Sequence, residues 1–280
     1  MNRDILKECS RVVIKIGTNS LMKTPTKIDY QKIDRLAFVC ASLQQQGREV
    51  IMVTSGAVGV GAGTMNLDEY PEAAAEKQAL ASVGQSVLMN LYSRFFQHYN
   101  QHVGQILMTR DIMNYSNAYS NCRISIDSLL KSNIIPIINE NDAVSVDEPG
   151  HCSKFGENDT LAAVVTELVD ADLLIILSDV DGLYDANPHS DPNAALISFV
   201  GDIDEEIQAM AGGSGSVFST GGMETKIKAA QSMMDLGKSM VITSAENPGI
   251  MFDILDGNEA GTLFRKAEAE ILLRGDEGIL

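Results

Sequence analysis

The stretch RVVIKIGTNS, residues 11–20, decides the fold of this chain. Its first six residues form a short run, rich in β-branched side chains and apolar apart from Arg11 and Lys15, which is typical of a parallel strand buried on both faces. Residues 29–46 then carry apolar side chains at helical spacing, between a capping Asp and a Gly. A second apolar run, EVIMVT, follows at residues 49–54. The order strand, helix, strand predicts a parallel βαβ unit.

The same pattern repeats along the chain. Further buried strands are predicted at residues 103–108, 134–138, 173–177 and 239–243. Further helices are predicted at residues 72–99, 118–131, 158–169, 203–210 and 224–236. Alternation around a Pro-Gly turn predicts a projecting β-hairpin at residues 144–155, and residues 211–222 are typical of a flexible glycine-serine loop. The repeated unit predicts an α/β fold, with a mainly parallel sheet covered by helices on both faces.

Length and composition restrict the class of protein. The 280 residues can bury one large core or two lobes, and 45% hydrophobic content with 5% aromatic residues indicates a globular α/β chain. The formal net charge of −17 argues against nucleic acid or an anionic membrane as the main partner. The four cysteines have no C-x-x-C spacing, so neither a disulfide framework nor a zinc site is indicated. There is no leader pattern and no apolar run of about 20 residues, so we expect a cytoplasmic protein.

Polar and glycine-rich clusters follow four of the predicted strands, at residues 17–20, 55–61, 139–142 and 178–182. Ligands of open α/β sheets bind outside the carboxyl ends of the strands, so we expect these clusters to meet at one edge. The second cluster does not match the dinucleotide pattern G-x-G-x-x-G, and no segment matches the P-loop pattern. A phosphate site in this chain must therefore be assembled from separate loops.

Two lysines are candidates for binding an anion. Lys15 interrupts a buried strand, and a buried ammonium needs an anionic partner; the alternative is a buried stem whose head reaches solvent. Lys226 lies one turn inside the helix that follows the glycine turn of residues 219–222. Glycines allow close approach of the main chain and a helix N-terminus favours anions, although an ordinary loop with a solvated lysine would look the same.

Amides and carboxylates cluster at residues 139–142 (NEND) and 156–160 (GENDT). Amides both donate and accept hydrogen bonds, so together with carboxylates they suit a substrate that carries an ammonium group and carboxylates. That combination indicates an amino acid. Capping of the following helix by Asn158 or Asp159 is expected to account for part of the pattern.

Six motifs in order resemble the glutamate 5-kinase group of the amino acid kinase family. They are VVIKIGTNS (12–20), IMVTSGAVGVG (51–61), PIINENDAV (136–144), FGENDTLAA (155–163), LLIILSDVDGLYDANP (173–188) and STGGMETKIKAA (219–230). The resemblance extends over residues 11–264. It implies an α/β/α sandwich in one amino acid kinase domain, with a glutamate-binding lobe at about residues 1–170 and a nucleotide-binding lobe at about 171–265. Many relatives carry a C-terminal PUA domain, and the resemblance here is to the short form without one.

The resemblance implies phosphorylation of the γ-carboxylate of L-glutamate by ATP with Mg²⁺, the first step of proline biosynthesis. It assigns Lys15, Lys226 and Asp159 to catalysis, with Asp159 organising the two lysines. Glutamate would be held by Ser55, Asn139, Asp142 and Asn158. ATP would be held by Lys15, Gly17, Ser178, Asp179, Thr220, Gly221, Gly222, Met223, Glu224, Thr225 and Lys226. No protein ligand is assigned to Mg²⁺, which the phosphates of ATP would mainly carry.

The resemblance also implies feedback inhibition by proline, a homo-oligomer and transfer of the product to a glutamyl phosphate reductase. Two departures are visible, because Glu157 stands where relatives commonly have Asp and Ser178 where many have Thr. One alternative is another family member, such as an acetylglutamate, carbamate, uridylate or isopentenyl phosphate kinase. The other is a non-catalytic amino acid sensor. We expect no nucleic acid and no membrane as partner.

Overall fold

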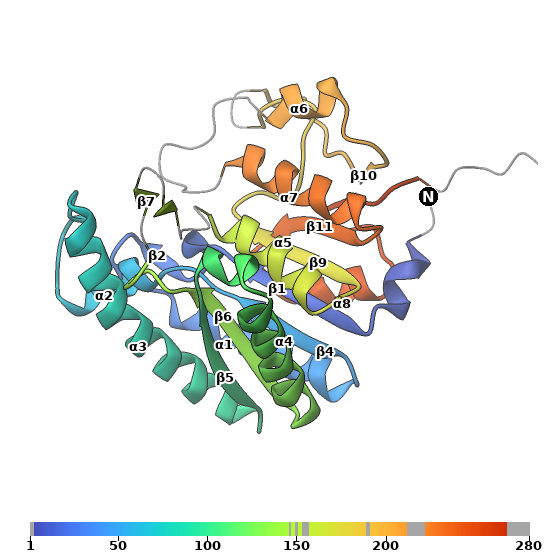
Figure 1. Cartoon of the computed structure of the whole chain (residues 1–280). Helices are drawn as coiled ribbons and strands as arrows, with labels where there is room; N and C mark the ends of the chain where they lie inside the picture. Colours follow the sequence, from blue (N-terminus) through green and yellow to red (C-terminus); the bar gives the residue numbers. More distant parts are fainter. Residues whose placement is uncertain are drawn as a thin grey trace, which may run out of the picture.

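The computed structural model describes residues 3–145, 147–148, 151–152, 157–188, 191–211 and 222–267. Within these ranges, a central sheet of eight strands has the order β10-β12-β11-β9-β1-β4-β6-β5 (Figure 1). The six predicted strands are present as β1 (Arg11–Ile16), β4 (Glu49–Val53), β5 (His102–Met108), β6 (Ile134–Glu140), β9 (Leu173–Ser178) and β11 (Ser239–Ser244). All neighbours among these six strands pair in parallel, as the βαβ pattern predicts.

Two short strands at the sheet edge were not predicted. β12 (Thr262–Phe264) pairs antiparallel with β11, and β10 (Phe199–Val200) pairs with β12. Strands of two or three residues are too short to show a periodic pattern. The other edge strand of the sheet is β5, and β1 lies near the middle between β4 and β9.

The helices of the described residues are α1 (Tyr30–Gln45), α2 (Ala57–Thr64), α3 (Ala74–His98), α4 (Ser116–Lys131), α5 (Asn158–Leu168), α6 (Glu205–Ala211), α7 (Met223–Asp235) and α8 (Ile250–Leu255). Apolar residues of α1, α3 and α8 form one core with alternate residues of β1, such as Val12 and Ile14. Residues of α4, α5 and α7 form a second core with Val13 on the opposite face. The fold is therefore the three-layer α/β/α sandwich that was predicted.

Helix α2 differs from the prediction of a polar glycine cluster after β4. Its residues AVGVGAGT have a glycine at every second position from 59 to 63, and because glycine disfavours helices, propensity does not predict a helix here. A methyl group on Gly84 of α3 would overlap the main-chain oxygen of Ala57, so only glycine allows α2 and α3 to pack this closely. Gly56, which precedes α2, has a φ of 96° that favours glycine.

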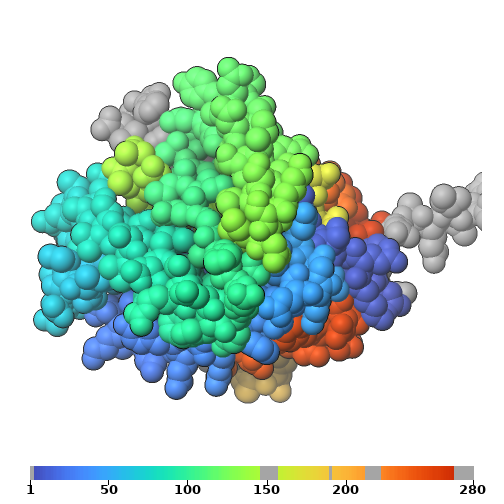
Figure 2. All heavy atoms as spheres, turned by 90° about the horizontal axis from the view of Figure 1, so that it is seen from below, coloured from blue at the N-terminus to red at the C-terminus, as the bar shows by residue number. Residues whose placement is uncertain are grey.

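The predicted hairpin is present in part, because β7 (Asp147–Glu148) pairs antiparallel with β8 (His151–Cys152). A second small hairpin, β2 (Met22–Thr24) with β3 (Lys27–Ile28), was not predicted. The predicted loop of residues 211–222 lies mostly outside the described residues. No helix among the residues that the structure describes is long and apolar enough to cross a membrane. From below, Figure 2 shows N-terminal residues, in dark blue, beside orange residues of the C-terminal part of the chain.

Candidate active site

Lys15, Asp159 and Lys226 meet at the carboxyl edge of the sheet. Lys15 is the fifth residue of β1, Asp159 the second of α5, and Lys226 is in the first turns of α7. Lys15 Nζ lies 2.7 Å from Asp159 Oδ1, and Lys226 Nζ lies 3.2 Å from Asp159 Oδ2. All three side chains are buried, at 7% exposed or less. Because the stem and the ammonium of Lys15 are both buried, the alternative that its head reaches solvent is wrong.

Burial controls the ionisation of this cluster. It lowers the pKa of Lys15 below the usual value, and Lys226 lowers it further, while Asp159 acts in the opposite direction. For Asp159, burial alone would raise the pKa, but the two lysines and the Thr225 hydroxyl outweigh it and the pKa is lowered. The Thr225 hydroxyl donates to Asp159 Oδ2 at 2.9 Å. Asp159 therefore pairs with two buried ammonium groups, one at each carboxylate oxygen.

Of the predicted nucleotide-binding residues before α7, Gly17 lies beside this cluster, and Ser178 and Asp179 lie at the end of the neighbouring strand β9. A Cβ on Gly17 would be 3.7 Å from Lys15 Nζ and 4.0 Å from the carbonyl oxygen of Leu177, so this glycine lies between β1 and β9. The Ser178 hydroxyl donates to Asp179 at 3.0 Å, and the Ser178 carbonyl accepts from the main-chain N–H of Ala245 at 2.7 Å. The loop after β9 is thus tied to the loop after β11.

The glycine turn before α7 is described only from Gly222 onward. Thr220 and Gly221 lie outside the described residues. Gly222 is the N-terminal cap of α7, which begins at Met223 and brings Lys226 to Asp159. Glu224 is on the exposed side of the same helix and pairs with Lys228 at 2.7 Å.

Asn158 is the centre of the predicted substrate residues. Its amide nitrogen Nδ2 lies 2.6 Å from the Thr54 carbonyl oxygen, 2.8 Å from Ser55 Oγ and 3.0 Å from Asn139 Oδ1, and its two hydrogens are shared among these three acceptors. The ends of β4, β6 and α5 therefore meet through one side chain. Asp142, the fourth of these predicted residues, is half-buried in the turn that follows β6.

The expectation that Asn158 or Asp159 caps α5 is wrong. The capping position is Glu157, and no side chain accepts a capping hydrogen bond there. Asn158 and Asp159 are the first two helical residues, and both side chains face the strand ends instead. The amide and the carboxylate are therefore available for the site.

Sequence reasoning missed a polar layer beneath these residues. Gln85 Oε1 on α3 accepts from Asn139 Nδ2 at 2.8 Å, and Tyr92 OH on the same helix lies 2.7 Å from Thr54 Oγ1. Both side chains are buried. The seven-residue spacing of Gln85 and Tyr92 places them on one helix face, but only the burial of a polar side chain shows that this face supports a site.

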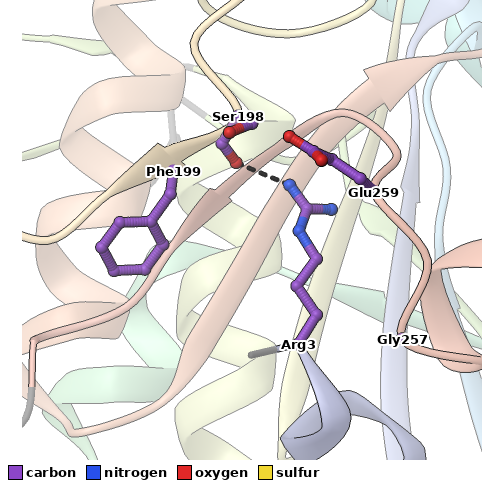
Figure 3. A pocket seen from close by; sticks show the side chains of 5 residues that line it. All are labelled: Arg3, Ser198, Phe199, Gly257 and Glu259. Carbon is purple, nitrogen blue, oxygen red and sulfur yellow. Dashed lines mark hydrogen bonds between the residues drawn. The ribbon is translucent and has the colours of Figure 1, made fainter. Parts of the chain in front are cut away.

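A separate hollow lies at the β10–β12 edge. It is lined by Arg3, Ser198, Phe199, Gly257 and Glu259 (Figure 3). The Arg3 guanidinium donates to the carbonyls of Ser198 and Ala260, both at 2.6 Å, and of Gly261 at 2.9 Å. The donors of Arg3 are used by main-chain carbonyls, so Arg3 anchors the N-terminal segment to the edge of the sheet. We therefore interpret this hollow as structural and not as a ligand site.

The three-layer fold with a charged cluster at the strand ends is that of an α/β protein, a class in which ligands commonly bind outside the carboxyl ends of the strands. The model of the "Amino acid kinase family" matches residues 10–244. The chain belongs to the amino acid kinase family, and it is a kinase.

Curated relatives narrow this assignment. The glutamate 5-kinase of Listeria innocua is 48% identical over 268 residues, which are 96% of this chain and 97% of the relative. The glutamate 5-kinase of Streptococcus thermophilus is 49% identical over 258 residues, 92% of this chain and 97% of that protein. Among solved structures, carbamate kinase from Giardia lamblia bound to AMP-PNP is similar with a TM-score of 0.65 and 16% identity, covering 93% of this chain and 100% of that one. At that identity the likeness shows the fold alone.

Proposed function

We propose that this kinase transfers the γ-phosphoryl group of ATP to the γ-carboxylate of L-glutamate and forms L-glutamyl 5-phosphate, the first step of proline biosynthesis. The near-full-length identity to glutamate 5-kinases supports the reaction. The observation that carries the proposed mechanism is the pair of buried lysines on one carboxylate, Asp159. This pairing distinguishes the proposal from a non-catalytic amino acid sensor, which has no need for two buried cations.

The proposed reaction needs no protein base. The γ-carboxylate is ionised at neutral pH, and one of its oxygens attacks the γ-phosphorus while the bond to the β-phosphate oxygen breaks and ADP leaves. Catalysis then consists of aligning two anions and compensating their charge. Lys15 and Lys226 supply positive charge to the transferring phosphoryl group, and Asp159 keeps both ammonium groups at fixed positions.

Mg²⁺ fits this site as a companion of the nucleotide. Among the described residues, no group of three or more His, Cys, Asp or Glu side chains is placed to hold a metal ion. Mg²⁺ is commonly bound through substrate phosphates and few protein ligands, and when bound it compensates phosphate charge. Gly17, Ser178, Asp179 and residues 220–226 are proposed to hold ATP around the two lysines.

The acceptor pocket is proposed to lie at Ser55, Asn139, Asp142 and Asn158. Asp142 would bind the α-ammonium group, and Asn158 presents its carbonyl oxygen because its nitrogen is bound by protein acceptors. A free ammonium group suits these oxygens, whereas an N-acetylated amino acid or a nucleotide acceptor does not. On the same family resemblance we propose proline as a feedback inhibitor, a homo-oligomer and a reductase that consumes the product.

The test is to trap the acyl phosphate with hydroxylamine while the acceptor is varied. Glutamate is expected to give hydroxamate with one ADP released per hydroxamate. Acetylglutamate, carbamate, UMP and isopentenyl phosphate are assayed in parallel by ADP release. Turnover with one of these acceptors and none with glutamate would reject the proposed substrate, and binding of glutamate without any ADP release would favour the sensor.

A further inference from the structure

We infer that Gln85, on α3, is a positioning residue for the acceptor substrate: through Asn139 it fixes Asn158 with its carbonyl oxygen directed to the ligand. The inference rests on the proposed function, because it takes Asn158 as part of the acceptor pocket. Gln85, Asn139 and Asn158 form a chain of hydrogen bonds from α3, through the end of β6, to the first residue of α5. Gln85 and Asn139 are 8% and 2% exposed, so water does not compete with this chain.

The contact with the main chain of Thr54 shows which way the Asn158 amide faces. A main-chain carbonyl oxygen only accepts hydrogen bonds, so the Asn158 atom 2.6 Å from Thr54 O must be the amide nitrogen. The same nitrogen meets Ser55 Oγ and Asn139 Oδ1. Among the residues that the structure describes, none donates to Asn158 Oδ1, which leaves this acceptor for a substrate donor such as an ammonium group.

The orientation of Asn139 is set by the main-chain N–H of Glu140. A main-chain N–H only donates, so the Asn139 atom 2.9 Å from it must be Oδ1. This oxygen therefore accepts from both Glu140 N and Asn158 Nδ2. The Nδ2 group of Asn139 then faces away, into the interior, and it needs an acceptor there because a buried donor without a partner costs about 1–3 kcal/mol.

Gln85 supplies that acceptor with its side-chain oxygen. Gln85 Oε1 lies 2.8 Å from Asn139 Nδ2, whereas Gln85 Nε2 is buried without a hydrogen-bond partner. The oxygen alone carries the positioning role. If this oxygen is removed, Asn139 Nδ2 loses its acceptor, and the Asn139 side chain is expected to turn toward another one. The hydrogen bond from Asn158 Nδ2 to Asn139 Oδ1 is then lost.

A purely structural role would produce a different result, and Gln44 is a matched control. It is also a buried glutamine at 8% exposed, and it also bonds to an asparagine, with Nε2 donating to Asn133 Oδ1 at 3.0 Å. Its Oε1 accepts from the main-chain N–H of Val50 at the start of β4, the end of the strand opposite the site. Gln44→Met removes one buried and one partly buried hydrogen bond without changing the chain of hydrogen bonds to Asn158.

The experiment compares Gln85→Met, Gln85→Glu and Gln44→Met in the full chain. For each we measure KM for glutamate and for ATP, kcat, the Kd for glutamate without ATP, and the urea midpoint of unfolding. Gln85→Met is expected to raise KM and Kd for glutamate about tenfold, with KM for ATP unchanged and kcat within about threefold. Gln85→Glu keeps the oxygen and is expected to stay within about threefold of the wild type. Gln44→Met is expected to lower the urea midpoint and to leave KM for glutamate unchanged.

Equal glutamate KM in Gln85→Met and Gln44→Met would overturn the inference, and so would a tenfold rise in Gln85→Glu. If Gln85→Met does not fold, Gln85→Glu remains as the test, because a tenfold rise in its KM for glutamate would still overturn the inference. Failure of the proposed function appears separately, in the wild type, as no hydroxamate from glutamate. The same KM comparison is then made with the acceptor that the wild type does phosphorylate.

Discussion

Lys15 of β1 and Asp159 of α5 form a buried ion pair with 2.7 Å between Nζ and Oδ1. The second oxygen of the same carboxylate pairs with Lys226 of α7. Buried ion pairs contribute little to stability compared with apolar contacts, because each charge loses its water. The pairing of Asp159 with Lys15 and Lys226 is therefore weak evidence for a role in stability.

Replacement of either lysine is expected to impair chemistry more than binding. In Lys15→Ala and in Lys226→Ala we expect kcat to fall about 10²-fold or more, because each removes a charge beside the transferring phosphoryl group. Lys228→Ala is the matched control, since Lys228 is on α7 but is exposed and pairs with Glu224. The measurement is kcat and KM of each folded variant, obtained from steady-state kinetics. A kcat near the wild-type value in either site variant would remove that lysine from the mechanism.

Activity is expected to fall in alkali at a pH below the ordinary pKa of lysine. Burial lowers the pKa of Lys15 from 10.5, so the free enzyme loses this charge earlier than an exposed lysine would allow. The measurement is kcat/KM for ATP against pH, which reports groups of the free enzyme. Lys15→Arg, which stays charged, should abolish this alkaline limb; an identical limb in that variant would assign it to another group.

The fall of activity in alkali is not expected to result from unfolding. The pKa of Lys15 is lower in the folded than in the unfolded state, so between the two values the unfolded state binds more protons. Stability from this group therefore rises with pH in that window. Circular dichroism at each pH checks this point, because a loss of signal parallel to the loss of activity would contradict it.

Asp142→Ala is expected to raise KM for glutamate, because its carboxylate is proposed to bind the α-ammonium group in ground and transition states alike. A hydrogen bond to a charged group contributes about 1.5–3 kcal/mol, which corresponds to roughly 10- to 100-fold in KM. Asp68→Ala, in an exposed loop, serves as control. A lower kcat at unchanged KM would instead indicate a role in the chemical step.

Gly84→Ala is expected to destabilise the fold by about 1–3 kcal/mol through overpacking. The added methyl group would overlap the Ala57 carbonyl oxygen and force α2 away from α3. Because α2 begins next to Ser55, KM for glutamate should rise as well. Gly222→Ala is the control for stability, since no atom of the described part of the chain lies within 4 Å of a Cβ at that position. Urea unfolding measures the difference, and equal stability of the two variants would show that α2 and α3 adjust freely.

Arg3→Met is expected to reduce the free energy of unfolding by about 1.5–3 kcal/mol, because the buried guanidinium donates to several main-chain carbonyls. Arg123→Met, at an exposed surface pair, should change it far less. Both variants are expected to keep kcat and KM, since the hollow around Arg3 is separate from the site. Altered ATP kinetics in Arg3→Met would contradict that separation.

Much of the fold was predictable because its strands are buried on both faces. Continuous apolar runs such as RVVIKI and the helical pattern after Asp29 allow little other structure, and Asp29 does cap α1 by accepting from Gln31 N and Lys32 N. The elements that were not predicted are α2, which is glycine-rich, and α8, the β2–β3 hairpin and the edge strands β10 and β12, which are too short for a clear period to appear. Their structure depends on packing against distant segments.

The sequence by itself determined the type of most elements, the parallel pairing of the six main strands and the candidate residues. Hydrophobic periodicity and the residues at strand ends are local properties of the sequence. The tertiary structure decided which charges meet: that one carboxylate, Asp159, lies between Lys15 and Lys226. It also decided the orientation of the Asn158 amide, because the groups that fix it come from β4, β6 and α3. Hydrogen bonds and ion pairs act over about 3 Å, and only folding brings residues so far apart in sequence to that distance.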